Sequence, residues 1–316
     1  MSWRSLFSQL DRFQKIVLAA IIITLVLIFI GGLVRASGAG LGCPDWPKCF
    51  GLWIPPTSVS DLPDTFDASD FNVVKTWTEY VNRLFGVLTG FFIVLTFVFS
   101  FSRLKTQPLV TAGSFLVLVM VIFQGWLGGQ VVQSGLESWI ISVHMITALL
   151  ILNLLVWIYM QSVQRRVKLF ITGSLRRQLK VILWMLLLVI LIQVILGTQV
   201  REALEGVKRT MPLLERGAWL EHTGLIDPVH RSFSWLVAGL AAYFFWLVKK
   251  RKCHFMIVHL SVLLLSIVVL QIISGIGMAY ASIPPFLQVM HLWLSAIMIM
   301  IPFLALLLIK EGHEKK

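Results

Sequence analysis

The sequence predicts an all-α integral membrane protein, in which eight transmembrane helices form two tandem four-helix bundles. Three observations predict this fold. Eight apolar runs reach the roughly 20 residues that a helix needs to cross a bilayer core. Only 13% of the 316 residues are charged, which is about half the share typical of a soluble domain. Motifs in the first half of the chain also recur in the second half at nearly constant spacing.

Each predicted span is a run of mostly apolar residues, and polar or charged segments separate the runs. The polar, basic segment Met1–Lys15 precedes the first run. That run is longer than the apolar core of a signal peptide, so we expect an uncleaved first helix. In chain order, the spans are predicted at Ile16–Val34, Trp77–Phe101, Leu109–Val132, Trp139–Met160, Val181–Val200, Val229–Val248, Phe255–Tyr280 and Phe286–Ile309.

Lysine and arginine residues set the predicted orientation. The N-terminus, the C-terminus and the connections 102–108, 161–180 and 249–252 carry 18 Lys and Arg against 3 Asp and Glu, whereas the rest of the chain carries 9 against 12. The positive-inside rule places both termini in the cytoplasm of a bacterial inner membrane. The net charge of +12 is therefore interpreted as anchoring the chain at anionic membrane lipid, and not as binding nucleic acid. The long connections Ala36–Thr76 and Arg201–Pro228 face outward.

The two halves of the chain share a repeated pattern. A Gln, a Gly four residues later and a His sixteen residues after that occur twice, beginning at Gln124 and, 147 residues later, at Gln271. The histidines of this pattern are His144 and His291. Each half holds four spans, so both halves insert in the same direction and we expect a pseudo-two-fold axis along the membrane normal. The predicted bundles are residues 1–165 and 166–316.

Histidines within membrane helices need a reason, because polar groups are costly there. His230 and His291 lie at the outer ends of the sixth and eighth spans, which run in the same direction. Neutral imidazole is a good iron ligand, and two histidines on different helices of a bundle can hold a haem between them. The alternative is that each histidine hydrogen-bonds a neighbouring helix. The repeat favours the haem site, because His144 falls at the same depth in the first bundle.

Another repeated pattern opens the second and sixth spans, where an acid is followed three residues later by Asn or His and then by Arg: Glu79, Asn82 and Arg83, and Asp227, His230 and Arg231. Arginine also ends the first and fifth apolar runs, at Arg35 and Arg201. Because guanidinium matches carboxylate geometry, these arginines either bind haem propionates or anchor the chain at the membrane interface. Glu79 is either an acid near a substrate or half of an interface ion pair with Arg83.

Two of the three cysteines, Cys43 and Cys49, share the first outer connection, and Cys253 stands in a basic inner connection. Disulfides persist on the outer side of the membrane. A zinc site is disfavoured, because no second pair of ligands lies nearby. The pair is therefore interpreted as a structural bridge or a redox-active dithiol. Cys253 is interpreted as an inert thiol, and no role is assigned to His222, His254, His259 and His313.

The chain resembles the haem A synthase family over nearly its whole length. The stretch Gly31–Cys49, with the sequence GGLVRASGAGLGCPDWPKC, looks like the first outer loop of that family. The Glu79-Tyr80-x-x-Arg83 start of the second span and the His230-Arg231 pair of the sixth also resemble it. His144 and His291 fall where the family's other helix-borne histidines fall. The loop motif is specific, whereas single histidines are not.

The resemblance implies that the chain oxidises the C8 methyl group of haem O to a formyl group, giving haem A for terminal oxidases. It implies a haem B cofactor in the second bundle, ligated by His230 and His291 with Arg201 and Arg231 nearby. It implies substrate haem O in the first bundle, near His144, Asn82, Arg83 and Arg35, with Glu79 as the catalytic acid. The family's loop cysteines correspond to Cys43 and Cys49, and haem O synthase and oxidase assembly factors are the implied partners.

The chain departs from the family at two places. Asn82 stands where family members usually have His, so the first bundle cannot offer a bis-histidine substrate site. We expect the substrate iron to be five-coordinate and open to oxidant. The second outer connection also lacks a cysteine pair that some members carry.

Two rival interpretations remain: a b-type haem electron-transfer protein, and a haem-handling protein without catalysis. Glu79 beside a site that lacks one iron ligand favours the enzyme. A cytochrome with two equivalent redox haems would keep both histidine pairs.

Overall fold

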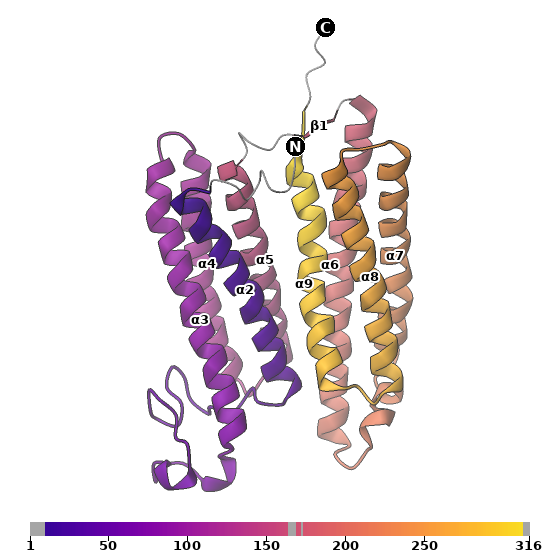
Figure 1. The fold of residues 1–316 in the computed structure, drawn as a ribbon. Helices are drawn as coiled ribbons and strands as arrows, with labels where there is room; N and C mark the ends of the chain where they lie inside the picture. Colours follow the sequence, from indigo (N-terminus) through magenta and orange to yellow (C-terminus); the bar gives the residue numbers. More distant parts are fainter. Residues whose placement is uncertain (1–9, 164–168, 172, 312–316) are drawn as a thin grey trace. The chain divides into compact units, whose positions relative to one another are not determined.

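The computed structural model describes residues 10–163, 169–171 and 173–311, and eight long α-helices dominate these residues (Figure 1). All eight are long and apolar enough to cross a membrane, which confirms the predicted all-α, multi-pass membrane fold. The helices are α2 Arg12–Ala36, α3 Val73–Ser100, α4 Pro108–Gln133, α5 Ser138–Val163, α6 Gly173–Thr210, α7 Ile226–Lys250, α8 Phe255–Tyr280 and α9 Pro285–Leu308.

Shorter elements connect these helices. Four 3-10 helices cover η1 Val59–Asp61, η2 Ala68–Asp70, η3 Phe101–Arg103 and η4 Arg216–His222. Two three-residue strands, β1 Leu169–Ile171 and β2 Ile309–Glu311, pair in parallel with Leu169 beside Ile309. This pairing was not predicted, because neither segment is long enough to show the alternation of a strand.

Residues 10–162 form one compact unit built on α2 to α5. Helix α2 packs on α3, and α3 packs on α4. Gly113 of α4 lies so close to α5 that an added Cβ would come within 2.6 Å of the Trp157 ring. The Gln14 side chain of α2 donates to the Ser162 carbonyl of α5 at 3.1 Å, so the four helices close into a bundle (Figure 1).

The residues described from 163 onward form a second compact unit. Helix α6 packs on α7, α7 on α8, α8 on α9, and α9 on α6, which again makes a four-helix bundle. Its core contains fully buried apolar side chains from every helix, including Leu183, Leu186, Ile190, Phe244, Leu264 and Ala296. The predicted boundary between residues 165 and 166 lies outside the described residues, and the pseudo-two-fold axis stays a prediction.

The predicted second outer connection, Arg201–Pro228, is wrong in part. Helix α6 continues through Thr210, η4 occupies a further stretch, and α7 begins at Ile226. The apolar run stops at Val200, but the helix goes on because Arg201 pairs with Glu205 one turn later and Leu204 and Val207 bury their side chains. The helix therefore continues beyond the apolar run, because apolar residues at helical spacing can still pack on the bundle.

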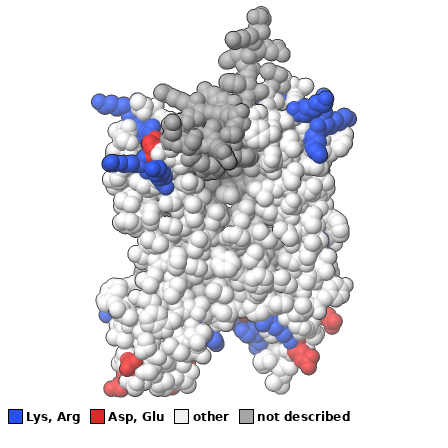
Figure 2. Space-filling model, viewed as in Figure 1, with Lys and Arg blue, Asp and Glu red and all other residues white. Residues whose placement is uncertain are grey.

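Within each unit, charged side chains lie near the helix ends on the face shown in Figure 2, and uncharged residues cover the part between them. This distribution is what a membrane-spanning chain requires, because charge in the hydrocarbon core is costly. The cytoplasmic placement of the termini stays a prediction.

Candidate functional site

His230 of α7 and His291 of α9 face each other in the second bundle. Their ring centroids are 6.3 Å apart and their planes are inclined by 63°. Two imidazoles on opposite sides of one metal ion would have centroids about 6.4 Å apart, because each metal–nitrogen bond is about 2 Å and each nitrogen lies about 1.2 Å from its ring centre. The separation therefore suits one metal ion between the rings.

The ligand count points to the kind of metal that would fit. Among the residues that the structure describes, no group of three or more His, Cys, Asp and Glu gathers to hold a metal ion. A pair of histidines is sufficient for a haem iron, because the porphyrin supplies the other four ligands. The two histidines are therefore too few for a protein-only metal centre, and the bis-histidine haem site stays a prediction.

For each candidate histidine, a glutamine on the preceding helix donates a hydrogen bond to the backbone carbonyl of the histidine. The Gln193 side chain of α6 donates to the carbonyl of His230 at 3.1 Å, and the Gln271 side chain of α8 donates to the carbonyl of His291 at 2.9 Å. In the first bundle, Gln124 of α4 makes the same bond to His144 of α5 at 3.0 Å. These bonds fix the height of each histidine against its neighbouring helix.

A glycine one turn after each glutamine makes room for the imidazole. An added Cβ would lie 3.1 Å from Cε1 of His230 at Gly197, 3.6 Å from that of His144 at Gly128, and 3.8 Å from that of His291 at Gly275. Gln193 was not predicted as part of the pattern, although its spacing to Gly197 equals that of the other two pairs. That spacing is the signal that could have identified it.

The contact of a glycine with the histidine position has a fourth counterpart, between α2 and α3, and it differs from the other three. An added Cβ at Gly31 of α2 would lie 3.7 Å from Oδ1 of Asn82 of α3, so Asn82 stands against its glycine as His230 stands against Gly197. Leu27 precedes Gly31 by one turn, where the other three sites have Gln. The histidine and the glutamine are therefore both replaced here. Oδ1 of Asn82 is buried without a hydrogen-bond partner.

Glu79 lies in the second turn of α3 and is only 4% exposed. One carboxylate oxygen accepts the backbone N–H of Cys43 at 2.9 Å. The other oxygen accepts from Nε and Nη2 of Arg83, one helical turn away. The predicted pair of Glu79 and Arg83 is therefore formed, and it is buried rather than solvated.

Arg83 binds the loop that carries the cysteines. Its Nη1 donates to the carbonyls of Asp45 at 2.8 Å and Lys48 at 2.6 Å, and its Nη2 donates to the carbonyl of Cys43 at 3.3 Å. Together with the bonds to Glu79, these contacts engage all five N–H groups of the guanidinium. Binding of a substrate carboxylate by Arg83 would require the exchange of one of these bonds.

Cys43 and Cys49 form a disulfide, so the zinc alternative is excluded. Both residues are buried, with 0% and 1% of their surfaces exposed. They pack with Phe50, and partly buried apolar residues surround this cluster, namely Leu62, Phe66, Phe71 and Tyr80. A buried disulfide is poorly accessible to an attacking thiolate, which favours the structural interpretation over the redox one.

The loop is also fixed to neighbouring helices by close backbone contact. An added Cβ at Gly42 would fall 2.4 Å from the carbonyl oxygen of Lys75, so only glycine fits there. The Thr76 hydroxyl donates to the Gly42 carbonyl at 2.8 Å. Trp46 of the loop lies against α4, where an added Cβ at Gly129 would meet its ring at 3.0 Å. The disulfide loop is thus held on α3 and α4.

The other predicted arginines differ in their surroundings. Nη1 of Arg35 lies 3.1 Å from the sulfur of Met145, the residue after His144. Arg201 donates to the side chain of Gln288, one turn before His291, and pairs with Glu205. Both therefore reach the helix that carries a histidine. Arg231 pairs with Asp227, but its side chain is 57% exposed.

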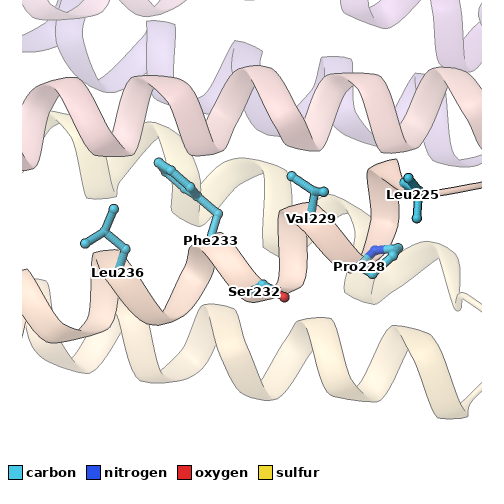
Figure 3. Close-up of a pocket in the computed structure, with 6 residues that line it drawn as sticks. All are labelled: Leu225, Pro228, Val229, Ser232, Phe233 and Leu236. Carbon is cyan, nitrogen blue, oxygen red and sulfur yellow. The ribbon is translucent and has the colours of Figure 1, made fainter.

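An apolar groove of about 470 Å³ runs along the first three turns of α7. Figure 3 shows Val229, Phe233 and Leu236 on one side of the helix, with Ser232 on another. His230 does not line this groove, so the groove is not assigned to the histidine site.

The remaining histidines make local contacts. Nδ1 of His222 lies 3.1 Å from the Ala218 carbonyl, and Nδ1 of His259 lies 2.7 Å from the Phe255 carbonyl. His254 caps the start of α8, and burial lowers its pKa. His313 lies outside the described residues.

Residues 14–303 match the family of cytochrome oxidase assembly proteins. The chain is also similar to three bacterial proteins named haem A synthase. Identity is 27% to that of Shewanella oneidensis, over 66% of this chain and 62% of that protein. It is 22% to that of Bartonella tribocorum, over 86% and 85%, and 26% to that of the Wolbachia of Brugia malayi, over 88% and 90%.

Proposed function

Because the chain belongs to the family of cytochrome oxidase assembly proteins, we propose that it is a haem A synthase, a membrane enzyme that oxidises the C8 methyl group of haem O to a formyl group. The observation that carries the proposal is the 6.3 Å separation of His230 and His291 in a bundle whose counterpart keeps only one histidine. Similarity to proteins named haem A synthase supports the same conclusion.

The second bundle is the proposed cofactor half. His230 and His291 would hold the iron of haem B, with Gln193 and Gln271 fixing their helices. Arg201, which reaches α9 beside His291 through Gln288, is the proposed partner of a haem propionate, and the more exposed Arg231 is a second candidate. Haem B would supply one-electron transfer.

The first bundle is the proposed substrate half. His144 would hold the iron of haem O, and Arg35, which lies against the next residue, is the proposed partner of a substrate carboxylate. Asn82 replaces the second ligand, and its carboxamide oxygen is buried without a partner. This arrangement supports a five-coordinate substrate iron whose other face is open to oxidant. Glu79 is the proposed acid beside it.

The proposed location is the bacterial inner membrane, with both termini in the cytoplasm. The disulfide loop would then lie at the outer surface of the membrane. Haem O synthase, which makes the substrate, and factors that assemble the terminal oxidase are the proposed partners.

The proposed function is tested by co-expressing the chain with a haem O synthase in a host that lacks haem A, and by separating the extracted haems by chromatography. We expect haem A from the wild type. His291→Ala should lose bound haem B, whereas His259→Ala, an exposed histidine of α8, should not. Haem B without haem A in the wild type would instead support the b-type electron-transfer protein.

The role of Glu79 is tested in the same host. We expect Glu79→Gln to abolish haem A formation and to keep haem B, because the change lies in the first bundle. Glu137→Gln is the matched control, since Glu137 is an exposed acid at the start of α5. Loss of haem B in Glu79→Gln would contradict a role confined to the substrate half.

A further inference from the structure

The histidines of the two bundles differ in what their second ring nitrogen contacts. Nδ1 of His291 lies 2.8 Å from the hydroxyl of Ser274 on α8. Nδ1 of His144 and Nδ1 of His230 are buried without a hydrogen-bond partner. Among the three candidate ligands, His291 is therefore the one whose ring nitrogen is bound by a side chain in the described structure.

The direction of this hydrogen bond follows from the other contact of Ser274. The hydroxyl donates its hydrogen to the carbonyl of Gln271 at 3.0 Å. A hydroxyl has one hydrogen and two acceptor lone pairs, so when its hydrogen points to the Gln271 carbonyl the oxygen accepts from His291, which is the arrangement we adopt here. Nδ1 of His291 therefore carries the proton, and Nε2 keeps its lone pair. That tautomer is the one in which Nε2 can bind iron.

A polar residue precedes the glycine at only one of the four corresponding sites, and that residue is Ser274. It immediately precedes Gly275, the glycine against which the imidazole of His291 lies. The residues that precede the corresponding glycines are Ile30, Leu127 and Leu196, none of which has a polar side chain. Ser274 is itself buried, with 8% of its surface exposed. The hydroxyl is thus placed inside the bundle at one histidine alone.

We propose that Ser274 is a positioning residue for the haem B cofactor: its hydroxyl fixes the tautomer of His291 and strengthens Nε2 as an iron ligand. The inference rests on the proposed function, because it assumes iron between His230 and His291. Outer partners of a ligating histidine typically orient the ring and raise its basicity, and their removal weakens metal binding 10–100-fold. The bond also makes the surroundings of the two candidate ligands, His230 and His291, unequal.

The test compares Ser274→Ala with Ser261→Ala in the full-length protein purified with its haem. Ser261 is a suitable control, because it lies on the same helix, is fully buried and makes the same bond to a carbonyl three residues earlier, without a histidine contact. The measurements are the rate of haem B transfer to apomyoglobin, the midpoint potential and the electron paramagnetic resonance of the ferric haem.

We expect haem B to leave Ser274→Ala about 10-fold faster than the wild type, if a typical outer-partner effect applies. The potential should rise, because a less basic ligand stabilises ferric iron less. A tenfold loss of preference for the ferric state corresponds to about 59 mV for one electron. Ser261→Ala should match the wild type in both measurements.

A second variant, which adds a hydroxyl instead of removing one, keeps the proposal testable if Ser274→Ala fails to fold. Leu196→Ser places a hydroxyl at the corresponding position beside His230, and we expect it to lower the potential. The inference is overturned if Ser274→Ala and Ser261→Ala behave alike while the wild type binds haem B through two histidines. A wild type that binds no haem B would instead overturn the proposed function.

Discussion

The two bundles use the same motif, an acid and an arginine four residues later, in different ways. In the first bundle, Glu79 and Arg83 are buried and bind the backbone of the disulfide loop. In the second bundle, Asp227 is buried but the Arg231 side chain is 57% exposed. The residue that immediately precedes the arginine differs as well: it is Asn82 in the first bundle and His230 in the second.

This difference teaches how a duplicated scaffold acquires two roles. The second bundle has a complete histidine pair and leaves its arginine near solvent, which suits a firmly held cofactor. The first bundle has one histidine and commits its ion pair to an outer loop, which suits a substrate that must enter and leave. The predictions below test each part of this comparison.

The largest expected effect concerns the ion pairs. Arg83→Met should destabilise the protein by about 3–5 kcal/mol, because it leaves Glu79 as a buried, unpaired charge. Arg231→Met, the matched change in the second bundle, also leaves a buried acid, Asp227, without its partner, but it should cost less, because Arg231 is 57% exposed and solvent already screens its ion pair. Thermal unfolding of both variants in detergent measures the difference. Equal losses would mean that the two motifs are energetically equivalent.

The next effect converts the second bundle into a copy of the first. We expect His230→Asn to reduce bound haem B by about 10-fold or more, because His230 would be one of two iron ligands and loss of a ligand weakens binding more than loss of an outer partner, which costs 10–100-fold. The pyridine haemochrome assay of the purified protein measures this. Full retention of haem B would show that His230 is not a ligand.

The converse change should give the first bundle a second ligand. In Asn82→His, we expect the bound substrate haem to become six-coordinate and low-spin, because the open face of the iron is then occupied. Visible absorption and electron paramagnetic resonance report the spin state. A wild type whose haem O is already fully low-spin would refute the five-coordinate site.

Most of the fold was predictable because membrane helices are long and apolar. The bounds of α8 match the prediction at both ends, and α4 and α9 differ from it by one residue at each end. The extension of α6 to Thr210 was not predicted, because its last ten residues are amphipathic and contain charged side chains. Hydrophobic length identifies the part of a helix within the bilayer but not the part beyond it.

The candidate ligands could also be recognised in the sequence, because polar residues are rare in such helices and the repeat marks them. Their surroundings could not. Burial of Glu79 under the Cys43 amide depends on how a loop of some 40 residues folds back on α3, and the contact of Ser274 with His291 joins two helices. A serine in a helix gives no signal of its own, because it commonly bonds its own backbone.

The smallest effect compares the cysteines of the two bundles. Cys253, in the connection between α7 and α8, is the free cysteine, whereas Cys43 and Cys49 are joined. Burial raises the pKa of the Cys253 thiol, although Arg251 nearby opposes this. The thiolate is the reactive form, so a maleimide should label Cys253 slowly at pH 7 and faster as the pH rises above the ordinary thiol range.

The same labelling experiment tests the orientation of the bundles. A membrane-impermeant maleimide should label Cys253 in inverted vesicles and not in spheroplasts, because the predicted topology places this connection in the cytoplasm. Cys253→Ser is the control, and it should remove the label entirely, since the buried disulfide of the first bundle offers no free thiol. Labelling in intact spheroplasts would mean that both bundles have the opposite orientation. The disulfide loop would then lie on the reducing side of the membrane, where a disulfide would not persist.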